Sequence, residues 1–140
     1  MSDTQVQFVD RGDGLRLAFR KREGQGPTIV FLPGYASDME GTKALALDAF
    51  ASERLLPLLR LDYSGTGSSE GAFEDGALAR WIDDAQLILD LMGDGPVVLA
   101  GSSMGAWIAL HLALRKPERV VGLIGIASAP DFTNGASPTG

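Results

Sequence analysis

The sequence predicts an α/β fold made of a β-hairpin followed by four mainly parallel strands with three crossover helices. Two observations support this expectation. Four short, almost continuous apolar runs are typical of strands buried on both faces of a parallel sheet, and they lie at 28–32, 56–61, 97–100 and 120–127. Helical apolar periodicity fills the segments between these runs, and such strand–helix alternation requires right-handed crossovers.

The hairpin is expected at the start of the chain. Residues 5–10 and 15–20 alternate apolar and polar side chains, and Gly12-Asp13-Gly14 lies between them. The helices are expected over 42–54, 77–92 and 103–115, and Pro117 ends the third. The second helix has the clearest apolar face, formed by Leu78, Trp81, Ile82, Ala85, Ile88, Leu89 and Met92.

Length and charge limit the possible classes of function. At 140 residues the chain has room for one domain, expected over 1–132, followed by a loose tail over 133–140. The 12 Lys and Arg residues against 18 Asp and Glu give a net charge of −6, which argues against binding to nucleic acid or anionic membranes. The absence of cysteine and the single histidine exclude thiolate chemistry and any site built from several imidazoles.

No targeting or membrane segment is expected. The first residues lack the basic and apolar regions of a signal peptide, which predicts a cytoplasmic location. The longest apolar stretch, 96–114, approaches the length of a membrane span. Gly101-Ser102-Ser103 and His111 interrupt it, so a buried strand followed by a helix fits better than a span.

The motif Gly-x-Ser-x-Gly occurs twice, at 67–71 and 101–105. A nucleophilic serine on this motif needs a sharp corner between a strand and a helix, which lifts its hydroxyl clear of the sheet. Ser103 has the apolar strand before it and the helix after it, whereas Ser69 has neither. Ser103 is therefore the candidate nucleophile. The alternatives are a plain glycine-rich turn at Ser103 and a turn after the second parallel strand at Ser69.

An oxyanion hole needs two N–H donors aimed at one point. The turn Pro33-Gly34-Tyr35 ends the first parallel strand, and its Tyr35 N–H could lie beside the Met104 N–H. The alternative is a Pro-Gly turn with no donor role. Nucleotide sites fit poorly, because Glu70 stands where the third glycine of a dinucleotide motif belongs, and no phosphate-loop lysine is present. No cofactor or metal is expected.

The chain resembles the N-terminal half of an α/β-hydrolase, and more specifically the ABHD10-like group of acyl-protein thioesterases and carboxylesterases. The resemblance covers about 5–132 and rests on the segments 31–44, 62–69, 101–105 and 117–120, of which Gly41-Thr42-Lys43 is the more specific element. It implies hydrolysis of a thioester or carboxylic ester, as by a palmitoyl-protein thioesterase, through an acyl intermediate on Ser103. It also implies oxyanion donors at Tyr35 and Met104, and a structural loop formed by Asp62, Gly65, Gly67 and Ser69.

The sequence departs from this family at the acid and the histidine that complete a catalytic triad with the serine. In this fold the acid and the histidine follow the serine along the chain. No histidine follows His111, and a helix rises about 12 Å over the eight residues that separate His111 from Ser103. His111 is expected to be a buried or half-buried helix residue. Asp131 occupies a place where some relatives have the acid, but it has no histidine to orient. The alternative function is therefore a catalytically incompetent fragment or remnant of such a hydrolase, without the histidine and acid.

The run 120–127 is expected to be an edge strand. It contains neither charge nor proline, which are the usual protections of a sheet edge. We therefore expect self-association through this segment, in addition to an ester or thioester substrate that is either a small molecule or an acylated protein.

Overall fold

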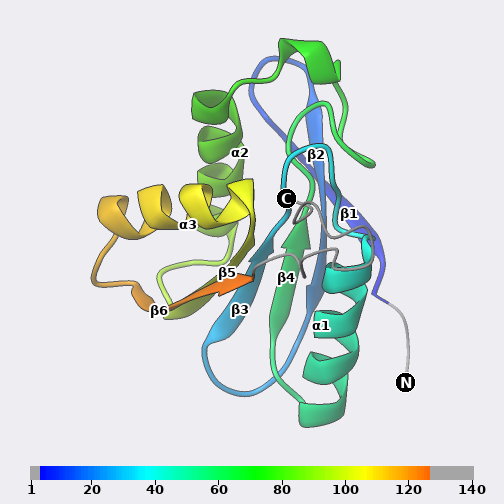
Figure 1. The fold of residues 1–140 in the computed structure, drawn as a ribbon. Coiled ribbons are helices and arrows are strands. Elements are labelled where there is room, and N and C mark those ends of the chain that lie inside the picture. The colour runs from blue at the N-terminus through cyan, green and yellow to red at the C-terminus, as the bar shows by residue number, and fades with distance from the viewer. Residues whose placement is uncertain (1–3, 127–140) are drawn as a thin grey trace, which may run out of the picture.

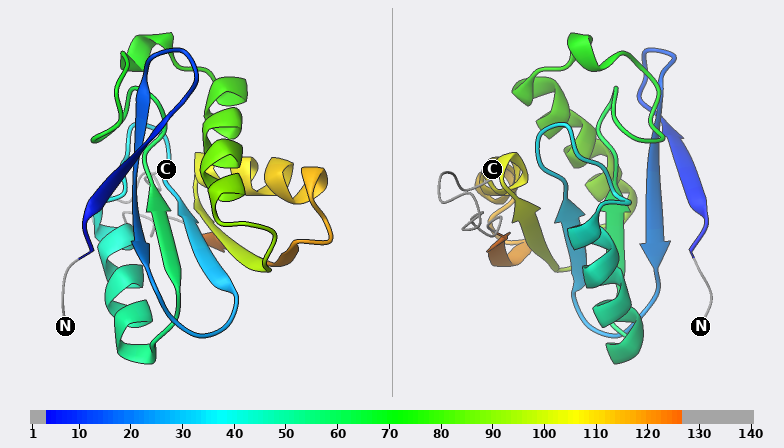
Figure 2. Two further views of the ribbon diagram at one scale, coloured as in Figure 1. Left: turned by 180° about the vertical axis from the view of Figure 1, so that it is seen from behind. Right: turned by 45° about the vertical axis from the view of Figure 1, so that its right-hand side comes forward.

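The computed structural model describes residues 4–126, which form a six-stranded mixed sheet with helices on both faces (Figures 1 and 2). The order across the sheet is β1-β2-β4-β3-β5-β6. In chain order the strands are β1 Val6–Asp10, β2 Arg16–Arg22, β3 Thr28–Leu32, β4 Leu58–Leu61, β5 Val97–Ser102 and β6 Val120–Ile126. The hairpin β1-β2 pairs antiparallel with β4, and the other four strands are mutually parallel, as the sequence predicts.

Three α-helices and one short 3-10 turn connect the parallel strands. They are α1 Thr42–Arg54, the turn η1 Phe73–Asp75, α2 Leu78–Leu91 and α3 Met104–Arg115. Helix α1 covers one face of the sheet, and α2 and α3 cover the other (Figure 2). The predicted fold class is therefore confirmed. The expected tail over 133–140 lies outside the described residues.

The main core lies between the sheet and the pair α2 and α3. Each of these elements contributes fully buried side chains to one continuous cluster, including Leu32, Leu61, Ile88, Leu99, Ile108 and Leu112. The apolar face that periodicity predicts for α2 points into this cluster, with Trp81, Ile82, Ala85, Ile88 and Leu89 buried. Burial of this face holds α2 against the core that it shares with the sheet and with α3.

The second parallel strand begins later than its apolar run. Leu55 ends α1 in the left-handed conformation, at φ 57°, and the Leu56 N–H donates to the Ala51 carbonyl at 2.9 Å. Leu56 therefore belongs to the end of the helix, and β4 starts at Leu58 after Pro57. Periodicity alone does not detect such a cap.

Strand β6 forms one edge of the sheet, and within the described residues it pairs only with β5. Val121, Leu123 and Ile124 on this strand are 58%, 49% and 50% exposed. Ala127, the last residue of the predicted run, lies outside the described residues.

Because an unprotected edge pairs readily with another strand, we expect Ile124→Lys to reduce self-association of the purified chain. Light scattering measures the effect. The matched control is Leu91→Lys on α2, where the replaced side chain is 52% exposed but lies away from the edge. A monodisperse wild-type monomer with the amides of 120–126 protected from hydrogen exchange would contradict the prediction.

None of the helices in the described part of the chain is long and apolar enough to cross a membrane.

Candidate functional site

Ser103 lies at the corner between β5 and α3, where the sequence predicts it. Its backbone has φ 56° and ψ −117°, a conformation that a residue with a side chain rarely adopts. The residue is exposed, in contrast to its buried neighbour Ser102. The strained turn thus presents the Ser103 hydroxyl above the carboxyl end of the sheet, as nucleophile-elbow chemistry requires.

Two glycines allow the corner to close. A Cβ at position 101 would lie 2.3 Å from the Gly105 carbonyl oxygen. A Cβ at position 105 would lie 2.0 Å from the Leu32 carbonyl oxygen at the end of β3. Helix α3 therefore packs directly on the backbone of β3, and any larger residue at either position would push the corner open.

The turn after β3 packs against the same corner. A Cβ at Gly34 would lie 2.9 Å from the Ser102 carbonyl oxygen and 3.3 Å from the Ser103 Cβ. The buried Tyr63 hydroxyl donates to the Pro33 carbonyl at 2.8 Å and holds the turn in place. Burial raises the pKa of Tyr63 well above its usual value, so the phenol stays protonated as a donor.

This packing places Tyr35 and Met104, the two predicted oxyanion donors, on either side of the predicted nucleophile Ser103 in the fold of the chain. Tyr35 follows Gly34 in the turn and lines one hollow together with Ser103. Met104 is the first residue of α3, where backbone N–H groups have no acceptor within the helix. The helix N-terminus also places positive potential near the corner.

Ser69, in the second Gly-x-Ser-x-Gly motif, has a different environment. Its hydroxyl donates to the Asp62 carbonyl at 2.7 Å and accepts the Ala18 N–H at 2.8 Å. It is buried in a turn with no helix directly after it. Ser69 therefore lies in a turn after β4, which is the alternative to a nucleophile that the sequence offers for this motif.

Asp62 connects the two loops around the site. Its carboxylate accepts the Met39 N–H at 2.7 Å and the Ser68 N–H at 2.8 Å, and thereby ties the loop before α1 to the loop after β4. Burial raises the pKa of Asp62 to about 6, even though both N–H donors act in the opposite direction. A Cβ at Gly67 would lie 2.2 Å from this carboxylate.

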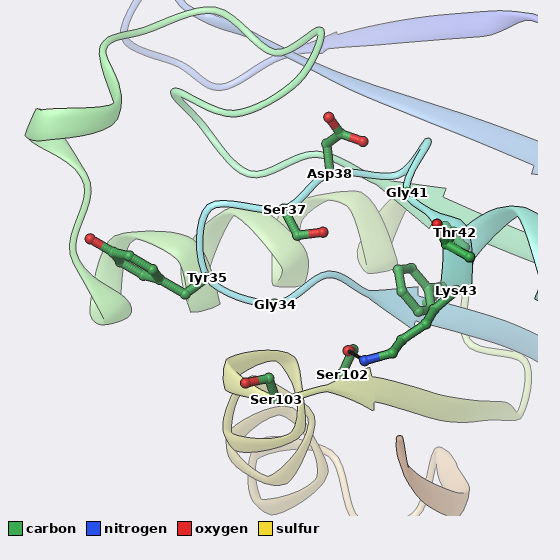
Figure 3. Close-up of a pocket in the computed structure, with 11 residues that line it drawn as sticks. Gly34, Tyr35, Ser37, Asp38, Gly41, Thr42, Lys43, Ser102 and Ser103 are labelled. Carbon is green, nitrogen blue, oxygen red and sulfur yellow. Dashed lines mark hydrogen bonds between the residues drawn. The ribbon is translucent and has the colours of Figure 1, made fainter. Parts of the chain in front are cut away.

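A hollow of about 400 Å³ opens beside Ser103 between the turn after β3 and the start of α1 (Figure 3). Lys43 reaches across it, and its Nζ donates to the Ser102 Oγ at 3.4 Å. In the sequence, Gly41-Thr42-Lys43 stands out only as the more specific part of the family resemblance. The elbow motif gives no signal that Lys43 lies beside it.

A second hollow of about 420 Å³ lies on the other side of Tyr35 and includes Met104 in its lining. Its wall contains an aromatic cluster, in which the Tyr35 and Phe73 ring centroids are 5.3 Å apart and those of Phe73 and Trp81 are 5.8 Å apart. The helical period predicts Trp81 on the core face of α2. Its indole N–H donates to the Ser64 carbonyl at 3.1 Å, which fixes the ring at this wall as well.

His111 is not buried, and that expectation was wrong. It is exposed on α3, on the side that also presents Trp107, Leu110 and Leu114 to solvent. The leucines on either side of His111 in the sequence suggested burial, but only Leu112 of them faces the core. On the same side of α3, Trp107 and Leu110 line a groove together with Ser103. Asp131 lies outside the described residues.

Among residues 4–126, no group of three or more histidine, aspartate or glutamate side chains is arranged to hold a metal ion.

Residues 27–138 match the family described as the alpha/beta hydrolase fold. The chain belongs to this family. It is 47% identical over 128 residues to human palmitoyl-protein thioesterase ABHD10, mitochondrial, covering 91% of this chain and 42% of that protein. It is 39% identical to the pimeloyl-[acyl-carrier protein] methyl ester esterase of Vibrio campbellii, covering 78% of this chain and 40% of that one.

The solved structure of mouse alpha/beta hydrolase domain-containing protein 10 superimposes with a TM-score of 0.83 at 39% identity, covering 93% of this chain and 52% of the mouse chain. This α/β-hydrolase chain therefore spans about half or less of the length of the relatives it matches. The ABHD10 relative is named as mitochondrial, so the predicted cytoplasmic location gains no support from it.

Proposed function

We propose that Ser103 of this α/β-hydrolase chain is the nucleophile of an ester or thioester hydrolase, with the Tyr35 and Met104 N–H groups as oxyanion donors. The observation that supports this most directly is the exposed corner at Ser103, whose φ of 56° with ψ of −117° lies outside the left-handed region used by the helix cap at Leu55, because strained backbone of this kind clusters at functional sites. Ser103 Oγ attacks the substrate carbonyl carbon, and its proton passes to a base or to solvent. The C–O or C–S bond then breaks, and the departing oxygen or sulfur takes up a proton and leaves as the alcohol or thiol. Water next attacks the acyl carbon of the Ser103 ester, which releases the carboxylic acid and returns a proton to the Ser103 oxygen.

The relatives' names support this choice of bond. One is named a palmitoyl-protein thioesterase and another a pimeloyl-[acyl-carrier protein] methyl ester esterase, so one name specifies a thioester and the other an ester. We propose the same class of substrate here, either a small molecule or an acylated protein.

A second candidate is that these 140 residues bind and accept the acyl group but do not release it. The observation in favour is that the single histidine of the sequence is exposed on α3, eight residues from Ser103. Release of the acyl group needs an activated water, and histidine is the usual base in this fold. This candidate predicts one equivalent of product from a thioester, whereas repeated turnover by the same chain would exclude it.

We expect a fluorophosphonate probe to label Ser103 slowly, because the corner and the oxyanion donors assist the reaction while the single histidine, His111, is exposed on α3 eight residues away. Intact and peptide mass spectrometry locate and time the label. Ser103→Ala should remove it, and far-ultraviolet circular dichroism should show that this variant is folded.

Ser68→Ala is the matched control, because Ser68 is also exposed and contributes its backbone N–H, not its hydroxyl, to Asp62. Label that persists in Ser103→Ala, or folded wild-type protein that takes no label, would overturn the assignment.

A further inference from the structure

Tyr63 lies just after β4, and its hydroxyl is directed at the turn that contains Tyr35. The ring is fully buried in the core cluster and packs against Trp81, with the two ring centroids 6.0 Å apart. The hydroxyl donates to the Pro33 carbonyl at 2.8 Å, across 30 positions of the sequence. Core packing of the ring therefore fixes the place of the hydroxyl. Because Tyr63 is fully buried, it does not contact a substrate held at Ser103.

Two neighbouring peptide groups in this turn determine where the Tyr35 N–H points. The Gly34 carbonyl accepts the Ser37 N–H at 3.1 Å. Since a trans peptide group is planar, with its C=O and N–H on opposite sides, this bond constrains the direction of the Tyr35 N–H. The preceding peptide group is held at the Pro33 carbonyl by Tyr63. Gly34 joins the two groups, and glycine restricts its own torsions least, so both hydrogen bonds are needed to fix the N–H.

The Pro33 carbonyl also lies against the first turn of α3. A Cβ at position 105 would be 2.8 Å from the Pro33 carbonyl oxygen, and Met104 directly precedes that position. A shift of the Pro33 peptide group would therefore change how the Tyr35 and Met104 N–H groups lie relative to each other. An oxyanion site is sensitive to such a change, because both donors must come within about 3 Å of one oxygen atom.

We propose that Tyr63 is a positioning residue of the oxyanion site, because its hydroxyl fixes the direction of the Tyr35 N–H through the Pro33 carbonyl. Tyr63 then lowers the barrier to attack by Ser103 without touching the substrate. The effect on the reaction rests on the proposed roles of Ser103 and Tyr35, whereas the effect on the turn does not. A merely structural hydrogen bond would stabilise the fold and leave the oxyanion site unchanged.

Two isosteric substitutions separate a positioning role from a structural one. Tyr63→Phe removes the hydroxyl and keeps the ring that packs in the core. Thr66→Val is the matched control, because the buried Thr66 hydroxyl also donates to a backbone carbonyl at 2.8 Å, that of Tyr63 in the same loop. Each variant loses one hydrogen bond from a hydroxyl to a carbonyl, so we expect both to lower the midpoint of thermal unfolding by about 3 °C. Of these two bonds, only that of Tyr63 reaches the turn after β3.

Two substrates that differ only in the carbonyl atom report on the oxyanion site. They are 4-nitrophenyl hexanoate and O-(4-nitrophenyl) hexanethioate, in which sulfur replaces the carbonyl oxygen. Sulfur is larger and accepts hydrogen bonds weakly, so a well-aligned oxyanion site favours the oxygen ester. Intact mass spectrometry measures the rate of Ser103 acylation at a series of substrate concentrations, which separates the maximal rate from the half-saturating concentration.

We expect Tyr63→Phe to lower the maximal rate with the oxygen ester about tenfold, less than the roughly hundredfold loss that follows removal of a whole donor. The half-saturating concentration should stay within about twofold of wild type, since the lost stabilisation belongs to the transition state. The ratio of the oxygen rate to the sulfur rate should fall about fivefold in Tyr63→Phe and stay unchanged in Thr66→Val. A wild-type ratio in Tyr63→Phe would overturn the proposal.

The direction of the Tyr35 N–H can also be measured in the absence of substrate. The one-bond residual dipolar coupling of this N–H reports its direction relative to the rest of the chain. It should change in Tyr63→Phe and keep its wild-type value in Thr66→Val. If no substrate acylates Ser103 in wild type but the coupling changes in Tyr63→Phe, the proposed function fails and the positioning of the turn stands. If the coupling does not change, the positioning fails whether or not Ser103 reacts.

Discussion

Gly105→Ala is expected to lower the free energy of unfolding by about 3 kcal/mol or more. The added methyl would lie 2.0 Å from the Leu32 carbonyl oxygen, a backbone atom at the end of β3, which is held between β4 and β5 and cannot turn aside. Helix propensity favours alanine over glycine by only about 1 kcal/mol, so the clash dominates. Thermal unfolding should show a decrease in the midpoint of roughly 10 °C.

The same substitution should also slow labelling of Ser103 at temperatures where the variant is still folded, because α3 must move away from β3. Gly95→Ala is the matched control, since a Cβ there has no atom within 4 Å. A midpoint for Gly105→Ala within about 2 °C of wild type would show that α3 does not pack on β3 as described.

The stability of this chain should also depend on the protonation of Asp62. Its folded pKa of about 6 is higher than the value of about 3.9 in an unfolded chain, so the folded state holds the proton more tightly. The Asp62 contribution is therefore stabilising below about pH 4 and is lost as the pH rises through about 6. The full loss is about 3 kcal/mol.

Asp62→Asn should remove this dependence, because the amide does not ionise. The measured quantity is the free energy of unfolding of the variant minus that of wild type. We expect this difference to increase by about 1 kcal/mol between pH 5.2 and pH 7.5. Urea denaturation at a series of pH values measures it. Asp94→Asn, an exposed site with the same change in charge, is the control. A difference between Asp62→Asn and wild type that is independent of pH would contradict the prediction.

The sequence by itself predicted the sheet and the corner. Buried parallel strands need apolar side chains on both faces, so they appear as continuous runs, and the apolar face of α2 appears as a helical period. The corner at Ser103 was predictable for a local reason, since its strand, its glycines and its helix are all within a few residues of one another. The strands, the apolar face of α2 and the corner each depend on residues that are close together in the sequence, so they can be predicted from it.

Only the tertiary structure decided which surfaces meet. Lys43 and Ser102 are 59 positions apart, and the packing of the turn after β3 against the corner brings them together. The helical spacing of Trp81 predicts a core residue. The structure shows that Trp81 also lines the aromatic hollow beside Tyr35. His111 looked buried from its neighbours, but in the described residues no element covers that side of α3. Periodicity tells which side of a helix is apolar, whereas the contact that covers or exposes that side depends on residues distant in sequence.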